Sequence, residues 1–122
     1  MGPIIVWTDI PVVELDRAIA FYATVLGKEV TKQTMGEFSM GLLPGAGKNP
    51  SGCLVVSNEN KPSKSGPLIY LNVSGRLDSA IAAVSSSGGT VLEGKHQIGP
   101  YGFRAIITDS EGNRIALHSP TE

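Results

Sequence analysis

The sequence predicts an α+β fold made of two βαβββ modules in tandem, and three observations lead to this prediction. The segment at 15–20 recurs at 77–82 with five of six residues identical. An alternating apolar strand precedes each copy, and three further candidate strands follow each copy. The chain has 15 Gly and 8 Pro among its 122 residues, which favours many turns over long helices.

The first module is expected to begin with a strand in which Val6, Ile10 and Val12 share one face at period two. That face should carry the helix. The helix is predicted over 14–26 and should stop at Gly27, because glycine readily adopts the left-handed conformation of a helix C-cap. Three more strands are predicted near 29–34, 37–43 and 53–57.

The second module repeats the plan. Its first strand places Ile69, Leu71 and Val73 on one face, and its helix should run over 77–87 and end at the glycine pair 88–89. The remaining strands are predicted near 90–96, 103–109 and 114–118. We expect a single domain over 1–122, with module 1 at about 4–57, a polar linker at 58–67 and module 2 at about 68–119.

Composition narrows the class of protein. The formal net charge is −1, with 41% hydrophobic and 17% charged residues, which disfavours disorder, nucleic-acid binding and a polybasic membrane surface. No apolar run approaches the roughly 20 residues that span a bilayer, and the first residues lack the pattern of a signal peptide. Since Cys53 is the single cysteine, no internal disulfide can form. We expect a cytoplasmic protein with neither nucleic-acid nor membrane partners.

Two segments are similar to a known superfamily. DIPVVELDRAIAFY at 9–22 and DSEGNRIAL at 109–117 resemble the vicinal oxygen chelate superfamily, which includes glyoxalase I, bleomycin-resistance proteins and extradiol dioxygenases. The resemblance is closest to bacterial glyoxalase-related proteins that lack the metal ligands. It implies a curved, mostly antiparallel half-barrel sheet around a concave pocket, with the helices on the convex side. It also implies a homodimer, whose modules pair within one chain or between two.

The resemblance further implies four positions for ligands of a divalent metal ion. In this chain these positions are Trp7, Val55, Leu68 and Ala116. A shift of one residue offers no ligand either, because the neighbours are Val6, Leu54, Ile69 and Leu117. We therefore expect no metal site and no cofactor, which argues against the metal-dependent chemistries of the superfamily.

Strand alternation directs the other side chains toward the concave face. The candidate ligand-binding residues are Trp7, Asp9, Tyr70, Asn72, Tyr101 and His118. The rings of Trp7 and Tyr70 are suited to a planar ligand, and Tyr101 lies between two glycines in a loop able to close over it.

Asp9 and His118 are the candidate catalytic pair, because a carboxylate can hold an imidazole in one tautomer for acid–base chemistry. The alternative is that Asp9 bonds a loop backbone while His118 is exposed. His96 is expected to be an exposed loop histidine, and Cys53 a small buried group rather than a nucleophile.

Two functions remain open at this point. The first is a metal-independent small-molecule binding protein of the glyoxalase/bleomycin-resistance type, which binds an aromatic or cationic compound in the concave pocket. The alternative is an enzyme: either a divergent glyoxalase-like isomerase or lyase with Asp9 or His118 as a general base, or a dioxygenase-related metal enzyme whose ligands lie at positions other than the four named above. The sequence does not name the ligand.

Overall fold

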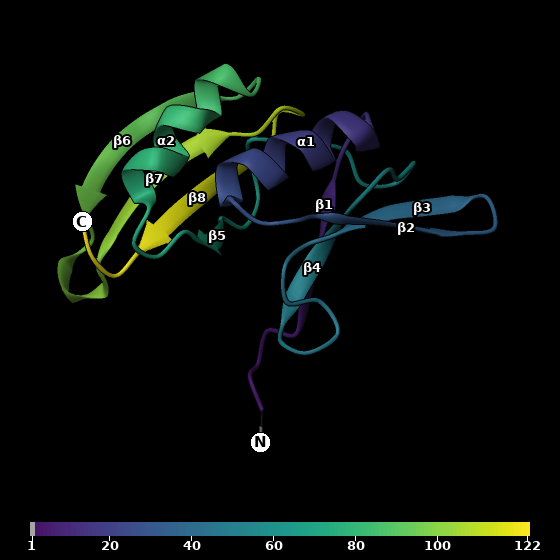
Figure 1. Cartoon of the computed structure of the whole chain (residues 1–122), viewed down its shortest axis with the longest axis horizontal. Helices are drawn as coiled ribbons and strands as arrows, with labels where there is room; N and C mark the ends of the chain where they lie inside the picture. Colours follow the sequence, from purple (N-terminus) through teal and green to yellow (C-terminus); the bar gives the residue numbers. More distant parts are fainter. Residues whose placement is uncertain (1) are drawn as a thin grey trace.

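Two four-stranded sheets diverge from a pair of adjacent helices in the computed structural model, which describes residues 2–122 (Figure 1). The first module contains β1 (Trp7–Pro11), α1 (Leu15–Leu26), β2 (Thr31–Met35), β3 (Phe38–Leu42) and β4 (Ser51–Val55). The second contains β5 (Ile69–Asn72), α2 (Leu77–Ser86), β6 (Thr90–Gln97), a short 3-10 turn (Gly99–Tyr101), β7 (Phe103–Thr108) and β8 (Arg114–Ser119).

The two sheets have the same topology. Sheet A has the order β1-β4-β3-β2, and sheet B has the order β5-β8-β7-β6. In each sheet the first strand pairs in parallel with the last, and the remaining pairs are antiparallel. The predicted α+β fold of two βαβββ modules is therefore confirmed. No helix among residues 2–122 is long and apolar enough to cross a membrane.

Helix α1 forms because its apolar residues recur at helical spacing and bury one stripe. The buried residues are Ala18, Phe21, Tyr22, Val25 and Leu26. The helix ends at Gly27, as predicted: this residue has φ 68° and donates its N–H to the carbonyl oxygen of Ala23 at 3.0 Å.

Four details of the predicted strands and helices were wrong. Val6 precedes β1 and is 65% exposed, whereas Ile10 and Val12 are buried as predicted. Strand β4 covers Ser51–Val55 rather than 53–57, so it begins and ends two residues earlier than predicted. Helix α2 ends at Ser86, one residue early, and β8 continues to Ser119.

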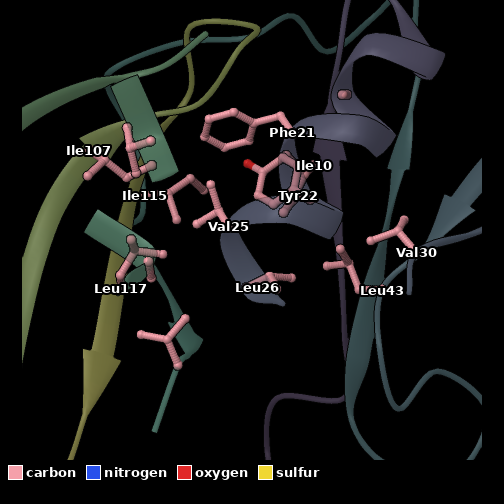
Figure 2. Close-up of a cluster of buried hydrophobic side chains, with 14 of the residues drawn as sticks. Ile10, Phe21, Tyr22, Val25, Leu26, Val30, Leu43, Ile107, Ile115 and Leu117 are labelled. Atoms are coloured by element: carbon pink, nitrogen blue, oxygen red, sulfur yellow. The ribbon is translucent and has the colours of Figure 1, made fainter. Parts of the chain in front are cut away.

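The buried core joins the two modules. Figure 2 shows Phe21 and Val25 of α1 facing Ile107 of β7 and Ile115 of β8, while Val30 and Leu43 lie on the side of sheet A. Helix α1 thus packs on sheet A and also reaches the core of sheet B. This shared core fixes the modules against each other and leaves the opposite faces of both sheets uncovered.

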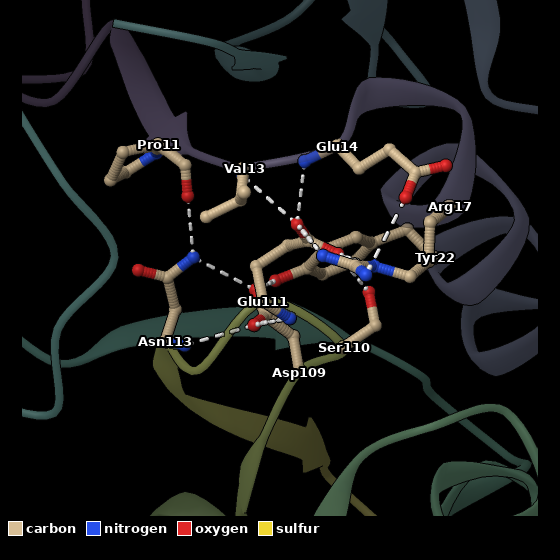
Figure 3. A network of polar contacts seen from close by, with 9 residues as sticks. All are labelled: Pro11, Val13, Glu14, Arg17, Tyr22, Asp109, Ser110, Glu111 and Asn113. Atoms are coloured by element: carbon tan, nitrogen blue, oxygen red, sulfur yellow. Dashed lines mark hydrogen bonds and ion pairs between the residues drawn. The ribbon is translucent and has the colours of Figure 1, made fainter. Parts of the chain in front are cut away.

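A carboxylate from module 2 binds the beginning of α1 (Figure 3). The Glu111 side chain is fully buried and accepts hydrogen bonds from the backbone N–H groups of Val13 and Glu14 at 2.9 and 2.8 Å. It also pairs with Arg17, whose Nε lies 2.8 Å from Oε2. These donors, with the Ser110 hydroxyl, outweigh the effect of burial and lower the pKa of Glu111 to about 2. An anion at a helix N-terminus is also favoured by the helix dipole.

Asp109, two residues earlier, connects the same loop to the core. Its carboxylate accepts from the Tyr22 hydroxyl at 2.5 Å, from the backbone N–H groups of Glu111 and Asn113, and from the Asn113 amide. The Asn113 amide also donates to the Pro11 carbonyl oxygen at 2.7 Å. The 109–113 loop therefore holds β1 and α1 through side chains as well as through packing (Figure 3).

Module 2 contacts the other end of α1 as well. The guanidinium of Arg76, the residue before α2, donates to the Val25 carbonyl oxygen at 2.6 Å in the last turn of α1. A cation there complements the negative end of the helix dipole. Module 2 thus supplies an anion to the start of α1 and a cation to its end.

Candidate functional site

Sheet B carries a row of polar side chains across its uncovered face. The strand register pairs His96 of β6 with Arg104 of β7, and Arg104 with His118 of β8. His118 is in turn level with Asn72 of β5. Tyr70, two residues before Asn72, shares that face because side chains alternate along a strand. Cross-strand neighbours lie close together, so one row gathers groups from all four strands.

Arg104 is the centre of this row. Its Nε donates to His96 Nε2 at 2.9 Å, and its Nη1 donates to the Tyr70 hydroxyl. Its Cζ also lies 5.9 Å from the centroid of the Tyr70 ring, within the range of a cation–π contact. The guanidinium is therefore held by one neutral ring nitrogen and one phenol.

The protonation of His96 follows from its partners. Its Nδ1 lies 2.8 Å from the Gly94 carbonyl oxygen, which can only accept a hydrogen bond. Nδ1 therefore carries the proton, and the lone pair of Nε2 receives Arg104. The β6–β7 register is irregular between Glu93 and His96, and such a bulge redirects the side chains that follow it. The predicted exposed loop histidine is instead a partly buried strand residue that positions Arg104.

A hollow of about 480 Å³ opens beside this row. It is lined by Tyr70, Ile98, Tyr101, Arg104 and His118, and these five residues define the sheet B hollow. Its size suits a small organic molecule. Tyr101 is 75% exposed and Tyr70 is 45% exposed, so both rings have faces free for contact.

His118 is held by the loop that closes one side of the hollow. Its Nε2 lies 2.6 Å from the Tyr101 carbonyl oxygen, so Nε2 carries the proton and donates it there. The His118 and Tyr70 rings meet edge to face, with centroids 6.2 Å apart. Gly102, with φ 98°, lets the loop turn: a Cβ there would lie 2.6 Å from the Ser119 carbonyl oxygen.

Asp9 is in the other sheet and does not meet His118 within the chain. Its Oδ1 accepts from Trp7 Nε1 at 3.0 Å and from the Cys53 thiol at 3.3 Å. Burial, followed by the neighbouring Asp9, raises the pKa of Cys53 to about 11, so it stays a thiol at neutral pH. That state suits the predicted small buried group and not a nucleophile.

Asn72 and Trp7, two further candidate ligand-binding residues, do not line the sheet B hollow. Asn72 uses its side-chain oxygen to accept from the backbone N–H of Ser74 at 2.8 Å, forming the turn that leads into α2. Trp7 is 42% exposed at the edge of sheet A, so it is not part of the buried core of this chain. Of the predicted ligand-binding residues, Tyr70, Tyr101 and His118 line one hollow.

The four positions that the resemblance assigns to metal ligands do not suit a metal ion here. Trp7, Val55, Leu68 and Ala116 offer no oxygen, sulfur or basic nitrogen ligand. Among residues 2–122, no three side chains of His, Cys, Asp or Glu gather closely enough to hold an ion.

Sequence reasoning missed Arg104 and Ile98. The signal for Arg104 was available: Ala105 and Ile107 face the core of sheet B, so Arg104 must face the other way in an alternating strand. Ile98 follows the last residue of β6 and carries no periodic signal. A second cavity, of about 110 Å³, lies between the 58–67 linker and the two modules and is small for an organic ligand.

The two modules share one βαβββ topology, and each sheet leaves one face uncovered. Residues 4–117 match the family model of the Glyoxalase/Bleomycin resistance protein/Dioxygenase superfamily, and the chain belongs to that superfamily. A search of curated proteins finds no match.

Solved structures share this fold at low sequence identity. A glyoxalase/bleomycin resistance protein from Streptomyces sp. CB03234 is 24% identical with a TM-score of 0.70, over 92% of this chain and 96% of that one. A glyoxalase/bleomycin resistance protein from Albidiferax ferrireducens T118 is 17% identical with a TM-score of 0.70, over 93% and 96%. An E144Q glyoxalase I mutant from Zea mays is 19% identical with a TM-score of 0.69, and the match covers 93% of this chain and 46% of that one.

Proposed function

We propose that this chain is a metal-independent small-molecule binding protein of the glyoxalase/bleomycin-resistance type, which takes an aromatic or cationic compound. The observation that carries the proposal is the sheet B hollow, with its two exposed tyrosine rings and about 480 Å³ of space. Aromatic faces attract planar rings by stacking and cations through their quadrupole.

Binding without turnover is favoured by the separation of the candidate acid–base pair. Asp9 is engaged by Trp7 and Cys53 on sheet A, and His118 is engaged by the Tyr101 carbonyl on sheet B. A general base must lie within hydrogen-bond reach of the proton that it removes. Asp9 and His118 do not contact each other among residues 2–122, so the pair does not support the isomerase or lyase alternative.

We also propose that the protein works as a homodimer. Both uncovered faces expose large apolar side chains, including Trp7, Phe38, Tyr70 and Leu92 at 42 to 45% exposure. Strands β1 and β5 each pair with one strand only among residues 2–122, which leaves an edge for a second copy. A cytoplasmic location fits a chain whose one cysteine is a free thiol.

The test is a ligand screen on EDTA-stripped protein. Thermal unfolding is measured against a panel of aromatic and cationic small molecules, with and without Ni²⁺, Zn²⁺ and Mn²⁺. We expect at least one saturable, metal-independent stabilisation, stoichiometric recovery of the unchanged compound, and loss of the response in Tyr70→Leu. Phe38→Leu, a matched change at an exposed aromatic of sheet A, should keep it. A metal-dependent response, or conversion of the compound, would contradict the proposal.

A further inference from the structure

Arg104 carries a positive charge that has no acidic partner. No Asp or Glu oxygen among residues 2–122 lies within ion-pair distance of its guanidinium, whereas Arg17 pairs with Glu111 and Glu14. Arg76 and Arg114 donate to backbone carbonyl oxygens, at Val25 and Gly66. Arg104 differs from all three because its partners among residues 2–122 are the neutral groups of His96 and Tyr70.

The donors that remain free point to the kind of ligand group. A guanidinium has five N–H donors, and two of those of Arg104 are engaged by His96 and Tyr70. The Tyr70 oxygen accepts from Arg104, so its own O–H is still able to donate. The centre of the row therefore presents several hydrogen-bond donors and one positive charge. A planar guanidinium fork matches a carboxylate in both charge and shape.

The walls of the hollow add an apolar requirement. Ile98 and the rings of Tyr70 and Tyr101 line the same space as the Arg104 guanidinium. A ligand that fills the hollow must therefore combine an anionic end with a planar apolar body. A cationic compound would bring its charge toward Arg104, which opposes binding.

We infer that the sheet B hollow binds an aromatic carboxylate, with the carboxylate on Arg104 and the Tyr70 hydroxyl, and the ring against Tyr70 and Tyr101. His96 is a positioning residue in this site, because its Nε2 accepts a hydrogen bond from Nε of Arg104 and so holds the guanidinium in place. This inference rests on the proposed function, since it assumes that the hollow takes a small molecule, and it narrows the ligand class to anions.

Three probes that share a naphthalene ring test the inference: 2-naphthoate, its neutral amide 2-naphthamide, and the cation 2-naphthylmethylammonium. Binding is measured by calorimetry and by amide chemical shifts in two-dimensional NMR. We expect 2-naphthoate to bind saturably and at least tenfold more tightly than either other probe, with shifts centred on 98–104 and 118. Because this comparison uses the unaltered protein, it does not depend on how any variant folds.

Variants then locate the charge. Arg104→Met should lower the affinity for 2-naphthoate at least tenfold and change the affinity for 2-naphthamide by less than twofold. The affinity of Arg104→Lys for 2-naphthoate should lie between those of Arg104→Met and the unaltered protein. Lys95→Gln is the matched control. It also removes one positive charge, from the residue that precedes His96 on β6, and the Nζ of Lys95 lies 3.1 Å from Asp78 on α2. It should change neither affinity.

Each contrary outcome overturns a defined statement. Equal affinity for the carboxylate and the amide, or a loss in Lys95→Gln as large as in Arg104→Met, would overturn anion recognition while leaving an aromatic pocket in place. Tighter binding of the cation would also overturn it and would support the cationic branch of the proposed function. Absence of saturable 2-naphthoate binding would overturn the inference, and the wider ligand screen would then decide the proposed function separately.

Discussion

Individual polar residues of the 109–113 loop connect module 2 to β1 and α1 of module 1. Asp109 receives hydrogen bonds from four groups, including the buried Tyr22 hydroxyl. Burial, followed by the nearby Asp109 charge, raises the pKa of Tyr22 well above its usual value, so its hydroxyl stays a donor. A charged acceptor in a buried site makes each such donor costly to remove.

Replacing Tyr22 by Phe should therefore destabilise the protein while leaving the ring packing intact. The expected loss is about 1.5–3 kcal/mol, the range for a hydrogen bond to a charged group. Urea unfolding of Tyr22→Phe measures it, with Tyr101→Phe as the control, because the Tyr101 side chain is exposed. A loss below 0.5 kcal/mol, at the level of a neutral surface change, would show that Asp109 is satisfied without Tyr22.

Glu111 makes stability depend on pH in the acid range. Its pKa is about 2 in the folded protein and has an ordinary value of 4.5, so the folded state binds this proton less readily than the unfolded chain does. Its contribution is fully present above about pH 4.5 and is lost as pH falls toward 2. Stability should therefore decline through that window as Glu111 protonates.

Glu111→Gln should lower stability at pH 7 by about 2 kcal/mol and flatten the decline between pH 4.5 and 2. Urea midpoints at several pH values measure both effects. Glu37→Gln, at the exposed turn between β2 and β3, is the control and should follow the parent curve. An unchanged slope in Glu111→Gln would assign the acid sensitivity to other carboxylates.

At the scale of the elements, the repeated helices and most strands follow from sequence pattern. The segments LDRAIA and LDSAIA bury equivalent small residues, Ala18 and Ala80, both at 0% exposure. The bounds of single strands were less predictable. Strand β4 was predicted near 53–57, yet it includes Gly52, which lies where β1 approaches closely.

The candidate site was harder to predict for a related reason. Alternation correctly placed Tyr70 and His118 on one face, but it gives no information about contact between sheets. The expected meeting of Asp9 and His118 required the two sheets to face each other within the chain. Instead they diverge from the packed helices (Figure 1). The β6 irregularity that brings His96 to Arg104 has no sequence signal either.

Gly52→Ala tests the approach of β1 and β4. The added Cβ would lie 2.4 Å from the Thr8 carbonyl oxygen, a backbone atom that cannot rotate away. We expect a loss of about 1–3 kcal/mol from overpacking, measured by urea unfolding. Gly94→Ala is the control within β6, because a Cβ there meets no atom within 4 Å. Similar losses in both variants would point to glycine flexibility rather than to this contact.

At the scale of the whole molecule, the uncovered faces predict association. Trp7 is the single tryptophan and is 42% exposed in the chain, so its fluorescence reports on sheet A alone. If a second copy covers that face, emission should shift to shorter wavelength as concentration rises, and native mass spectrometry should show twice the 12.8 kDa chain mass. A monomer mass with concentration-independent emission would contradict the homodimer.

The contacts that module 2 makes with the two ends of α1 imply that the 58–67 linker is dispensable as a tether. Module 2 binds the beginning of α1 with Glu111 and its last turn with Arg76. Ser63 also exchanges hydrogen bonds with the start of β8, through Asn113 and the Arg114 N–H. A chain cut after the exposed Lys64 would keep all of these contacts. Two separately expressed fragments, 1–64 and 65–122, should therefore find each other and rebuild the fold, which makes the protein a natural starting point for a split reporter.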